Sequence, residues 1–184
     1  DKNAPITIIS YVGYNDPFTV RGFEVLDDIL DDFEDDVNVE IRNFPLSFQD
    51  KKYIEAQASE CALALTSENT FLKYIDNLMD SSDGDVDSVV REAAKLGIND
   101  IEMIKCLSDE KFLPEVLDDI KNGERDGVTG TPSFFINGQK ISGAQSYEVF
   151  AKIIKEELGN DYEVPTEYPS CYDGIRNQGE RGID

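Results

Sequence analysis

The chain has 184 residues, of which 39 are acidic and 17 are basic, and with no histidine its net charge is −22 at pH 7. A field of this sign, with no cluster of Lys and Arg to offset it, excludes nucleic-acid binding. The absence of histidine also excludes Ser-His-Asp and Cys-His nucleophiles, His-ligated metals and an imidazole general base. Apolar residues make up 40% of the chain, which predicts one globular unit with its own core. We expect no cofactor.

The apolar runs of the sequence, such as residues 6–9, are far too short to cross a bilayer. The chain starts at Asp1 without a methionine, directly before the first strand-like run, as chains do once a signal peptide or membrane anchor is removed. Three cysteines are compatible with an oxidising compartment. We therefore expect an exported protein that is periplasmic, extracellular or anchored facing outward.

The first third of the sequence predicts a β-α-β unit. Residues 6–12 are β-branched and almost continuously apolar, which is typical of a strand buried on both faces. Between residues 18 and 33, apolar side chains recur at three- and four-residue steps opposite a row of aspartates, which predicts an amphipathic helix. Residues 37–42 alternate between apolar and polar and predict a second strand. The sequence thus begins as an α/β protein.

The middle of the chain shows no strand pattern from about residue 51 to 127, and predicts a block of helices. The helices are expected at residues 53–65, 68–79, 85–96, 100–107 and 111–122, with breaks at residues 81–84, Gly97 and Gly123. Two short strands, 133–136 and 139–142, then flank an Asn137-Gly138 pair suited to a type I′ turn. A last amphipathic helix is expected at residues 147–158.

This order of elements predicts a thioredoxin fold with an all-helical insertion. The chain resembles the DsbA-like thiol-disulfide oxidoreductases in residues 4–9, 42–46 and 127–138, and in the alanines around Cys61. The resemblance extends to about Leu158. It implies two halves of a thioredoxin-like domain, an insertion between them, and a C-terminal arm or linker: residues 1–47 with 127–158, residues 48–126, and residues 159–184.

The active-site motif of that family is absent from this chain. In the family a Cys-x-x-Cys pair sits at the start of the first helix, where the helix dipole lowers the pKa of the first thiol. The corresponding residues here are Asp16, Pro17, Phe18 and Thr19, which keep Pro-Phe and lose both sulfurs. Without these thiols the site has no nucleophile for mixed-disulfide exchange and no disulfide to donate.

Asp16 and Pro17 have a structural explanation, because Asp is among the best N-cap residues and Pro is favoured at the first helical position. We expect the carboxylate to meet the N–H groups of Phe18 and Thr19. A second interpretation is that the carboxylate imitates the charge of a thiolate, so that a partner meets a site that looks permanently reduced. A general base at Asp16 is a third, although the sequence places no second carboxylate beside it.

Thr131-Pro132 resembles the cis-proline step of the family, which offers its backbone to an extended client peptide beside the helix start. The resemblance implies substrate-binding positions at Thr131, Pro132, Asp16 and Phe18. The alternative is that the proline only keeps the backbone clear of the helix start.

Cys61 and Cys106 resemble cysteines found in part of the family, and we expect a disulfide that closes the helical insertion on itself. The alternative is two buried free thiols that act as small apolar core residues. Cys171 then remains free, pairs with another molecule, or once contacted a segment outside this sequence.

The acidic residues around Gly84 do not fit a calcium loop. An EF-hand frame with Gly84 sixth would put Met79 first and Val90 twelfth, where no ligand stands. A solvated turn is expected, with no metal. The wider acidic surplus is explained equally by solubility, adaptation to salt or a basic partner.

Three functions fit these observations. The first is an exported DsbA-like pseudoenzyme that has lost dithiol exchange and keeps at most a peptide- or protein-binding role. The second is a thiol-disulfide oxidoreductase, or a silenced variant of one, that acts through the remaining cysteines. The third is a structural or interaction domain fused to something larger, with the tail as a linker.

Overall fold

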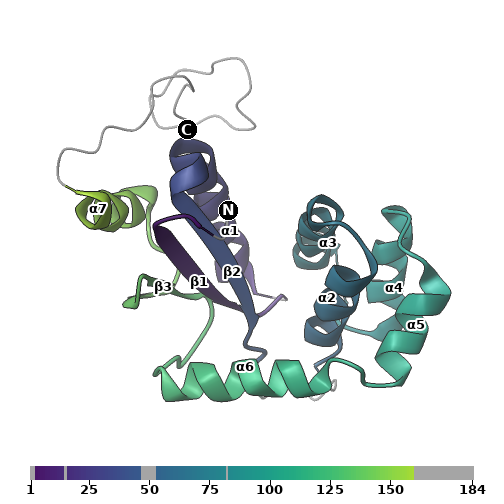
Figure 1. The fold of residues 1–184 in the computed structure, drawn as a ribbon. Helices are drawn as coiled ribbons and strands as arrows, with labels where there is room; N and C mark the ends of the chain where they lie inside the picture. Colours follow the sequence, from purple (N-terminus) through teal and green to yellow (C-terminus); the bar gives the residue numbers. More distant parts are fainter. Residues whose placement is uncertain (1–2, 15, 47–52, 82, 160–184) are drawn as a thin grey trace.

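The computed structural model describes residues 3–14, 16–46, 53–81 and 83–159 (Figure 1). Cys171 and the predicted arm beyond Gly159 lie outside the described residues. The elements are β1 (Ile6–Val12), α1 (Pro17–Phe33), the 3-10 helix η1 (Glu34–Asp36), β2 (Val37–Asn43), α2 (Ile54–Leu65), α3 (Glu68–Ser81), α4 (Val86–Lys95), α5 (Asp100–Ser108), α6 (Leu113–Arg125), β3 (Ser133–Ile136), β4 (Gln139–Ser142) and α7 (Tyr147–Leu158).

The four strands form one mixed sheet in the order β2-β1-β3-β4. β1 and β2 are parallel, with Ile6 opposite Val37, and α1 connects them. β3 runs antiparallel to β1, and β4 antiparallel to β3. Asn137 and Gly138 between β3 and β4 both have positive φ, of 44° and 90°, as a type I′ turn requires. The architecture is the predicted thioredoxin fold with a helical insertion.

Each face of the sheet is covered by different helices. Ile6 and Ile8 of β1 pack with Phe134 of β3 against α1 and α7. Tyr11, on the opposite face of β1, packs with Phe44 and with Ile120 of α6. Figure 1 shows α6 running along the bottom of the view, below the sheet and as far as α2.

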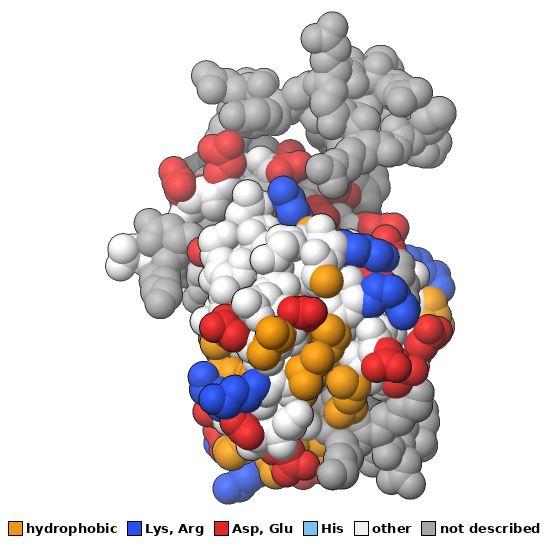
Figure 2. All heavy atoms as spheres, turned by 90° about the vertical axis from the view of Figure 1, so that its right-hand side faces the viewer, with side chains coloured by type: hydrophobic (Ala, Val, Ile, Leu, Met, Phe, Trp, Pro, Cys, Tyr) orange, Lys and Arg blue, Asp and Glu red, His pale blue; other side chains and the backbone are white. Residues whose placement is uncertain are grey.

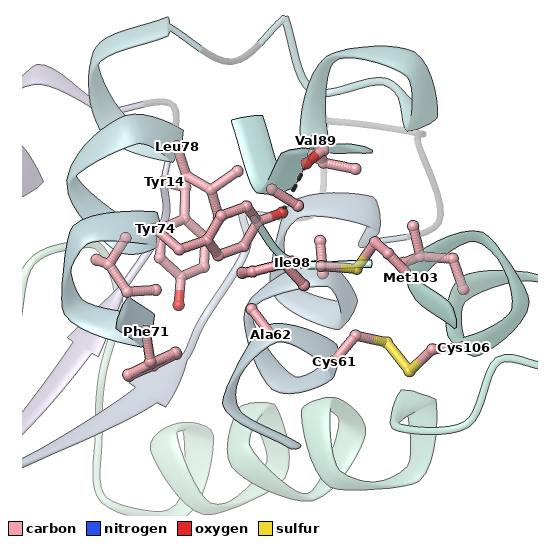
Figure 3. Close-up of a cluster of buried hydrophobic side chains, with 14 of the residues drawn as sticks. Tyr14, Cys61, Ala62, Phe71, Tyr74, Leu78, Val89, Ile98, Met103 and Cys106 are labelled. Carbon is pink, nitrogen blue, oxygen red and sulfur yellow. Dashed lines mark hydrogen bonds between the residues drawn. A yellow bond between two sulfur atoms is a disulfide. The ribbon is translucent and has the colours of Figure 1, made fainter. Parts of the chain in front are cut away.

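Helices α2 to α5 build a second core beside the sheet. Its centre is formed by buried side chains that include Tyr74, Val89 and Met103 (Figure 3). Ile75 belongs to the same core, and the end of β1 enters it through Val12. The Tyr74 hydroxyl donates a hydrogen bond to the carbonyl of Val89, 3.0 Å away, so α3 is tied to α4 inside this core. The helical block is therefore a packed unit and not a set of surface loops.

The outer face of this block is partly apolar. Figure 2 shows hydrophobic side chains gathered among acidic and basic ones on the side where α4 and α5 lie. On α5, Ile101 and Ile104 are 73% and 45% exposed. In the part of the chain that the structure describes, no helix combines the length and the apolar character needed to cross a membrane.

Gly123 does not break a helix, contrary to the prediction, because α6 continues through it to Arg125. The reason is packing: a Cβ on Gly123 would lie 2.7 Å from Cδ2 of Phe44 and 3.0 Å from Cε1 of Tyr11. The glycine thus lets α6 approach the aromatic face of the sheet, at the usual cost of glycine within a helix.

Candidate functional site

Asp16 begins helix α1 and caps it. Its backbone is extended, with φ −139° and ψ 112°, and Pro17 is the first helical residue. The Phe18 N–H donates to Asp16 Oδ1 at 3.0 Å, and the Val20 N–H donates to the Asp16 carbonyl at 3.2 Å. This geometry satisfies amide groups that have no partner within a helix, which is the capping role inferred from the sequence.

The second carboxylate oxygen of Asp16 joins two distant segments. Asp16 Oδ2 accepts a hydrogen bond from Thr19 Oγ1 at 3.0 Å and another from Thr131 Oγ1 at 2.9 Å. The prediction named the Thr19 N–H, whereas the bond found is from its hydroxyl. The bond from Thr131 agrees with the prediction that the cis-proline step lies beside the helix start, although the prediction did not name this hydrogen bond. Asp16, Thr19 and Thr131, which we call the Asp16 site, therefore link the first turn of α1 to the loop before β3.

The Thr131-Pro132 peptide bond is cis, and Pro132 is buried beside α1. Two glycines allow this approach. A Cβ on Gly22 would lie 3.2 Å from Cγ of Pro132 and 2.8 Å from Cζ of Phe134, and one on Gly13 would lie 3.3 Å from Oγ1 of Thr131. Neither glycine was singled out in the sequence, because only the folded chain shows what lies against it.

The exposed part of this region is formed by Pro17 and Phe18. Phe18 is the larger of the two. Its side chain is 53% exposed, and the Arg21 guanidinium carbon lies 5.0 Å from the centre of its ring. Asp16 and Thr131 are partly exposed, whereas Thr19 and Pro132 are buried. A partner that reaches the Asp16 site would therefore meet an aromatic ring with a cation above it, next to a carboxylate that already accepts three hydrogen bonds.

The described cysteines lie elsewhere. Cys61 of α2 and Cys106 of α5 form a disulfide, as the resemblance implied, and both are buried in the core of the helical block (Figure 3). Their exposed fractions are 0% and 7%. Because thiol exchange needs an accessible sulfur, this bond does not supply the reactive group that the Asp16 site lacks.

The acidic turn around Gly84 is accounted for by local contacts. Asp85 caps α4 by accepting the Ser88 N–H at 2.8 Å, and the Ser88 hydroxyl lies 3.3 Å from the Asp85 N–H. Asp83 lies 3.8 Å from Arg91. Among the residues described, no group of three or more Cys, Asp or Glu side chains is arranged to hold a metal.

Replacing Asp16 by alanine is expected to lower the free energy of unfolding by about 2 kcal/mol, roughly 1 for the lost cap and the rest for the buried Thr19 hydroxyl left without its acceptor. Asp16→Asn keeps an oxygen for the cap, so its loss should be smaller. Urea unfolding of the two variants measures both values. Equal losses would show that the charge, and not the cap, is what matters.

Comparison with known proteins identifies related sequences and folds. A family model described as thioredoxin matches residues 1–156. The Na(+)/H(+) antiporter NhaA 1 of Mycobacterium sp. (strain KMS) is 30% identical over 148 residues, which are 78% of this chain and 24% of the antiporter. The chain thus spans about a quarter of the length of the curated relatives it matches.

Two solved structures resemble the fold closely. Oxidised BdbD from Bacillus subtilis has a TM-score of 0.77 and 20% sequence identity, with 86% of this chain and 90% of BdbD covered. DsbA2 from Pseudomonas aeruginosa has a TM-score of 0.72 and 22% identity, with 88% of this chain and 92% of DsbA2 covered. At such identities the likeness concerns the fold alone.

Proposed function

Because the chain belongs to the thioredoxin family and has the fold of the DsbA-like proteins, we propose that it is an exported binding module that has lost dithiol exchange. Its binding surface consists of Phe18, the Asp16 site and the cis-proline loop. Its client is an extended peptide or a protein segment that pairs with the main chain near Thr131.

The observation that carries this proposal is the set of hydrogen bonds around Asp16. The carboxylate occupies the position where the family resemblance implies the first sulfur, and it accepts from the Phe18 amide and the Thr19 and Thr131 hydroxyls. A carboxylate can neither form nor break an S–S bond. One neutral donor engages Oδ1 and two engage Oδ2, which favours a structural role over that of a general base.

Binding does not require the lost sulfurs. Docking of an extended peptide relies on main-chain hydrogen bonds and on apolar contacts, and Phe18 offers a half-exposed ring at the edge of the site. The Arg21 guanidinium over that ring adds a cation that a carboxylate or carbonyl of the client can meet. These features support retention of client binding after the loss of catalysis.

Titration with an unstructured, thiol-free peptide tests this proposal. Binding is monitored through the amide chemical shifts of the full chain. We expect shifts to concentrate at Phe18 and Thr131, and Phe18→Ala to weaken the affinity. Leu72→Ala is the matched control, because Leu72 of α3 is also a large apolar side chain, 44% exposed. Absence of binding, or equal weakening by both variants, would refute the proposal.

Export is supported by the Cys61–Cys106 disulfide, because such bonds persist in oxidising compartments and are rare in the cytosol. An oxidoreductase that acts through these two cysteines is disfavoured by their burial in the helical core.

A second candidate function follows from the match to one part of an antiporter: the chain would be one domain of a larger transport protein. An antibody raised against this chain tests it in the source cells. A membrane-bound band far above 20.6 kDa would support the fused form, whereas a band near 20.6 kDa would exclude it.

A further inference from the structure

A buried asparagine joins three elements close to the Asp16 site. Asn43, the last residue of β2, is 1% exposed. Its backbone N–H donates to Oδ2 of Asp119 on α6 at 2.9 Å, and its side-chain amide donates to Oε1 of Glu60 on α2 at 2.7 Å. The Ser59 hydroxyl donates to Oδ1 of Asn43 at 3.1 Å. We call Asn43, Glu60 and Asp119 the Asn43 junction.

The two carboxyl groups of the junction are hard to ionise. Burial raises the pKa of Glu60, and the negative charges of Asp119 and Glu115 raise it further, against the hydrogen bond from Asn43. Burial also raises the pKa of Asp119, although the Asn43 N–H and the Arg42 guanidinium oppose the rise. Both groups therefore retain protons at a pH where an exposed carboxyl has lost them.

The surroundings of the junction supply more acids than bases. The titratable and charged groups that face the pair are Arg42 and Glu40 from β2, Glu115 from α6, and Tyr14 from the loop after β1, with Glu55 of α2 beyond Tyr14. Arg42 is already paired with Glu40 at 2.7 Å. Full ionisation of the junction would thus place two negative charges between α2 and α6 with little local compensation.

The junction lies one residue away from the groups that support the Asp16 site. The Phe44 N–H donates to the Val12 carbonyl at 2.7 Å. The Phe44 carbonyl lies 3.7 Å from where a Cβ on Gly13 would stand, and the same position lies 3.3 Å from Oγ1 of Thr131. Asn43 is therefore followed directly by a residue that contacts the end of β1 and lies near the cis-proline loop.

We propose that the Asn43 junction is a proton-dependent clamp that holds the helical insertion to the sheet, tight when a carboxyl group is protonated and looser when both are ionised. Protonation adds one proton from solvent to a carboxylate oxygen, which removes a charge that burial disfavours and, at Glu60, also the repulsion from Asp119. The carbonyl oxygens remain as acceptors for both donors of Asn43. Because the folded pKa values lie above the unfolded values of about 3.9 and 4.3, this stabilisation is complete at low pH and is lost as pH rises through the folded values.

Amide hydrogen exchange of the full chain tests the clamp. We expect the protection factor of the Asn43 N–H, corrected for intrinsic exchange, to fall with rising pH relative to that of the Phe44 N–H. Asp119→Asn keeps an oxygen acceptor without the charge, so the decrease should disappear. Glu124→Gln removes an exposed charge from the same helix and should leave the decrease unchanged.

A second measurement needs no variant. In a carbon-13 NMR titration of the unmodified chain, the side-chain carboxyl carbons of Glu60 and Asp119 should titrate above their ordinary values. Midpoints at or below those values would overturn the proposal. So would an Asn43 protection factor that does not change with pH relative to Phe44, or an Asp119→Asn variant that keeps the decrease of the parent.

Discussion

Removing the Cys61–Cys106 disulfide is expected to lower the free energy of unfolding by about 4 kcal/mol. The bond joins residues 45 apart in the sequence, so it restricts a large part of the unfolded chain. The loop-entropy relation gives a stabilisation of about 3 kcal/mol for a loop of roughly 15 residues and about 4.7 kcal/mol for one of roughly 100 residues. The value for this loop lies between the two. The bond also ties α2 to α5 in a core that the insertion builds largely from its own helices.

Urea unfolding measures this loss in two independent ways. The double variant Cys61→Ala with Cys106→Ala should unfold at a much lower urea concentration than the parent, and dithiothreitol should shift the parent in the same direction. Dithiothreitol should have no effect on the double variant, which controls for other actions of the reductant. A shift of the parent by less than about 1 kcal/mol would mean that the helical packing holds without the bond.

Restoring both sulfurs at the start of α1 is expected to restore thiol oxidation. Asp16→Cys with Thr19→Cys rebuilds Cys-Pro-Phe-Cys at a helix N-terminus, where the dipole and the unpaired N–H groups stabilise a thiolate. In the reaction, a peptide dithiol would attack the new disulfide, which leaves the peptide oxidised and the variant as a dithiol. Glutathione disulfide would then oxidise the variant again.

The double variant should therefore oxidise a reduced peptide at a rate well above that of Asp16→Ser with Thr19→Ser, a matched pair without sulfur. The acidic surface of the chain opposes the gain, because negative charge raises the cost of a thiolate. If the variant forms its disulfide yet does not exchange with a small flexible peptide, the client surface has been lost together with the sulfurs, and the proposed binding role is wrong.

Much of the fold could be predicted because its signals are local. The apolar run of β1, the Asp16-Pro17 helix start and the Asn137-Gly138 turn each act within a few residues, and the structure places β1, β3, β4 and α7 at the predicted residues. Gly123 was misjudged because its role depends on Phe44 and Tyr11, which are distant in the sequence. The sequence alone does not distinguish a glycine that ends a helix from one that lets another element pack closely against the helix.

The site was predictable where the family resemblance reached and not beyond it. The degenerate positions from Asp16 to Thr19 and the cis-proline step beside them follow from the resemblance, whereas the particular hydrogen bond from Thr131 to Asp16 depends on a loop conformation. The Asn43 junction could not be predicted from the sequence. Glu60 and Asp119 do not differ from other acidic residues there, and only the packing of α2 and α6 brings both of them to Asn43.

The most direct test of the proposed loss of dithiol exchange is a thiol-disulfide assay of the unmodified chain, both as an oxidant of a reduced peptide and as a catalyst of insulin reduction. The account predicts that neither rate exceeds the uncatalysed rate, since the Asp16 site holds no sulfur and the described disulfide is buried. Turnover comparable to that of the Asp16→Cys, Thr19→Cys variant would contradict it.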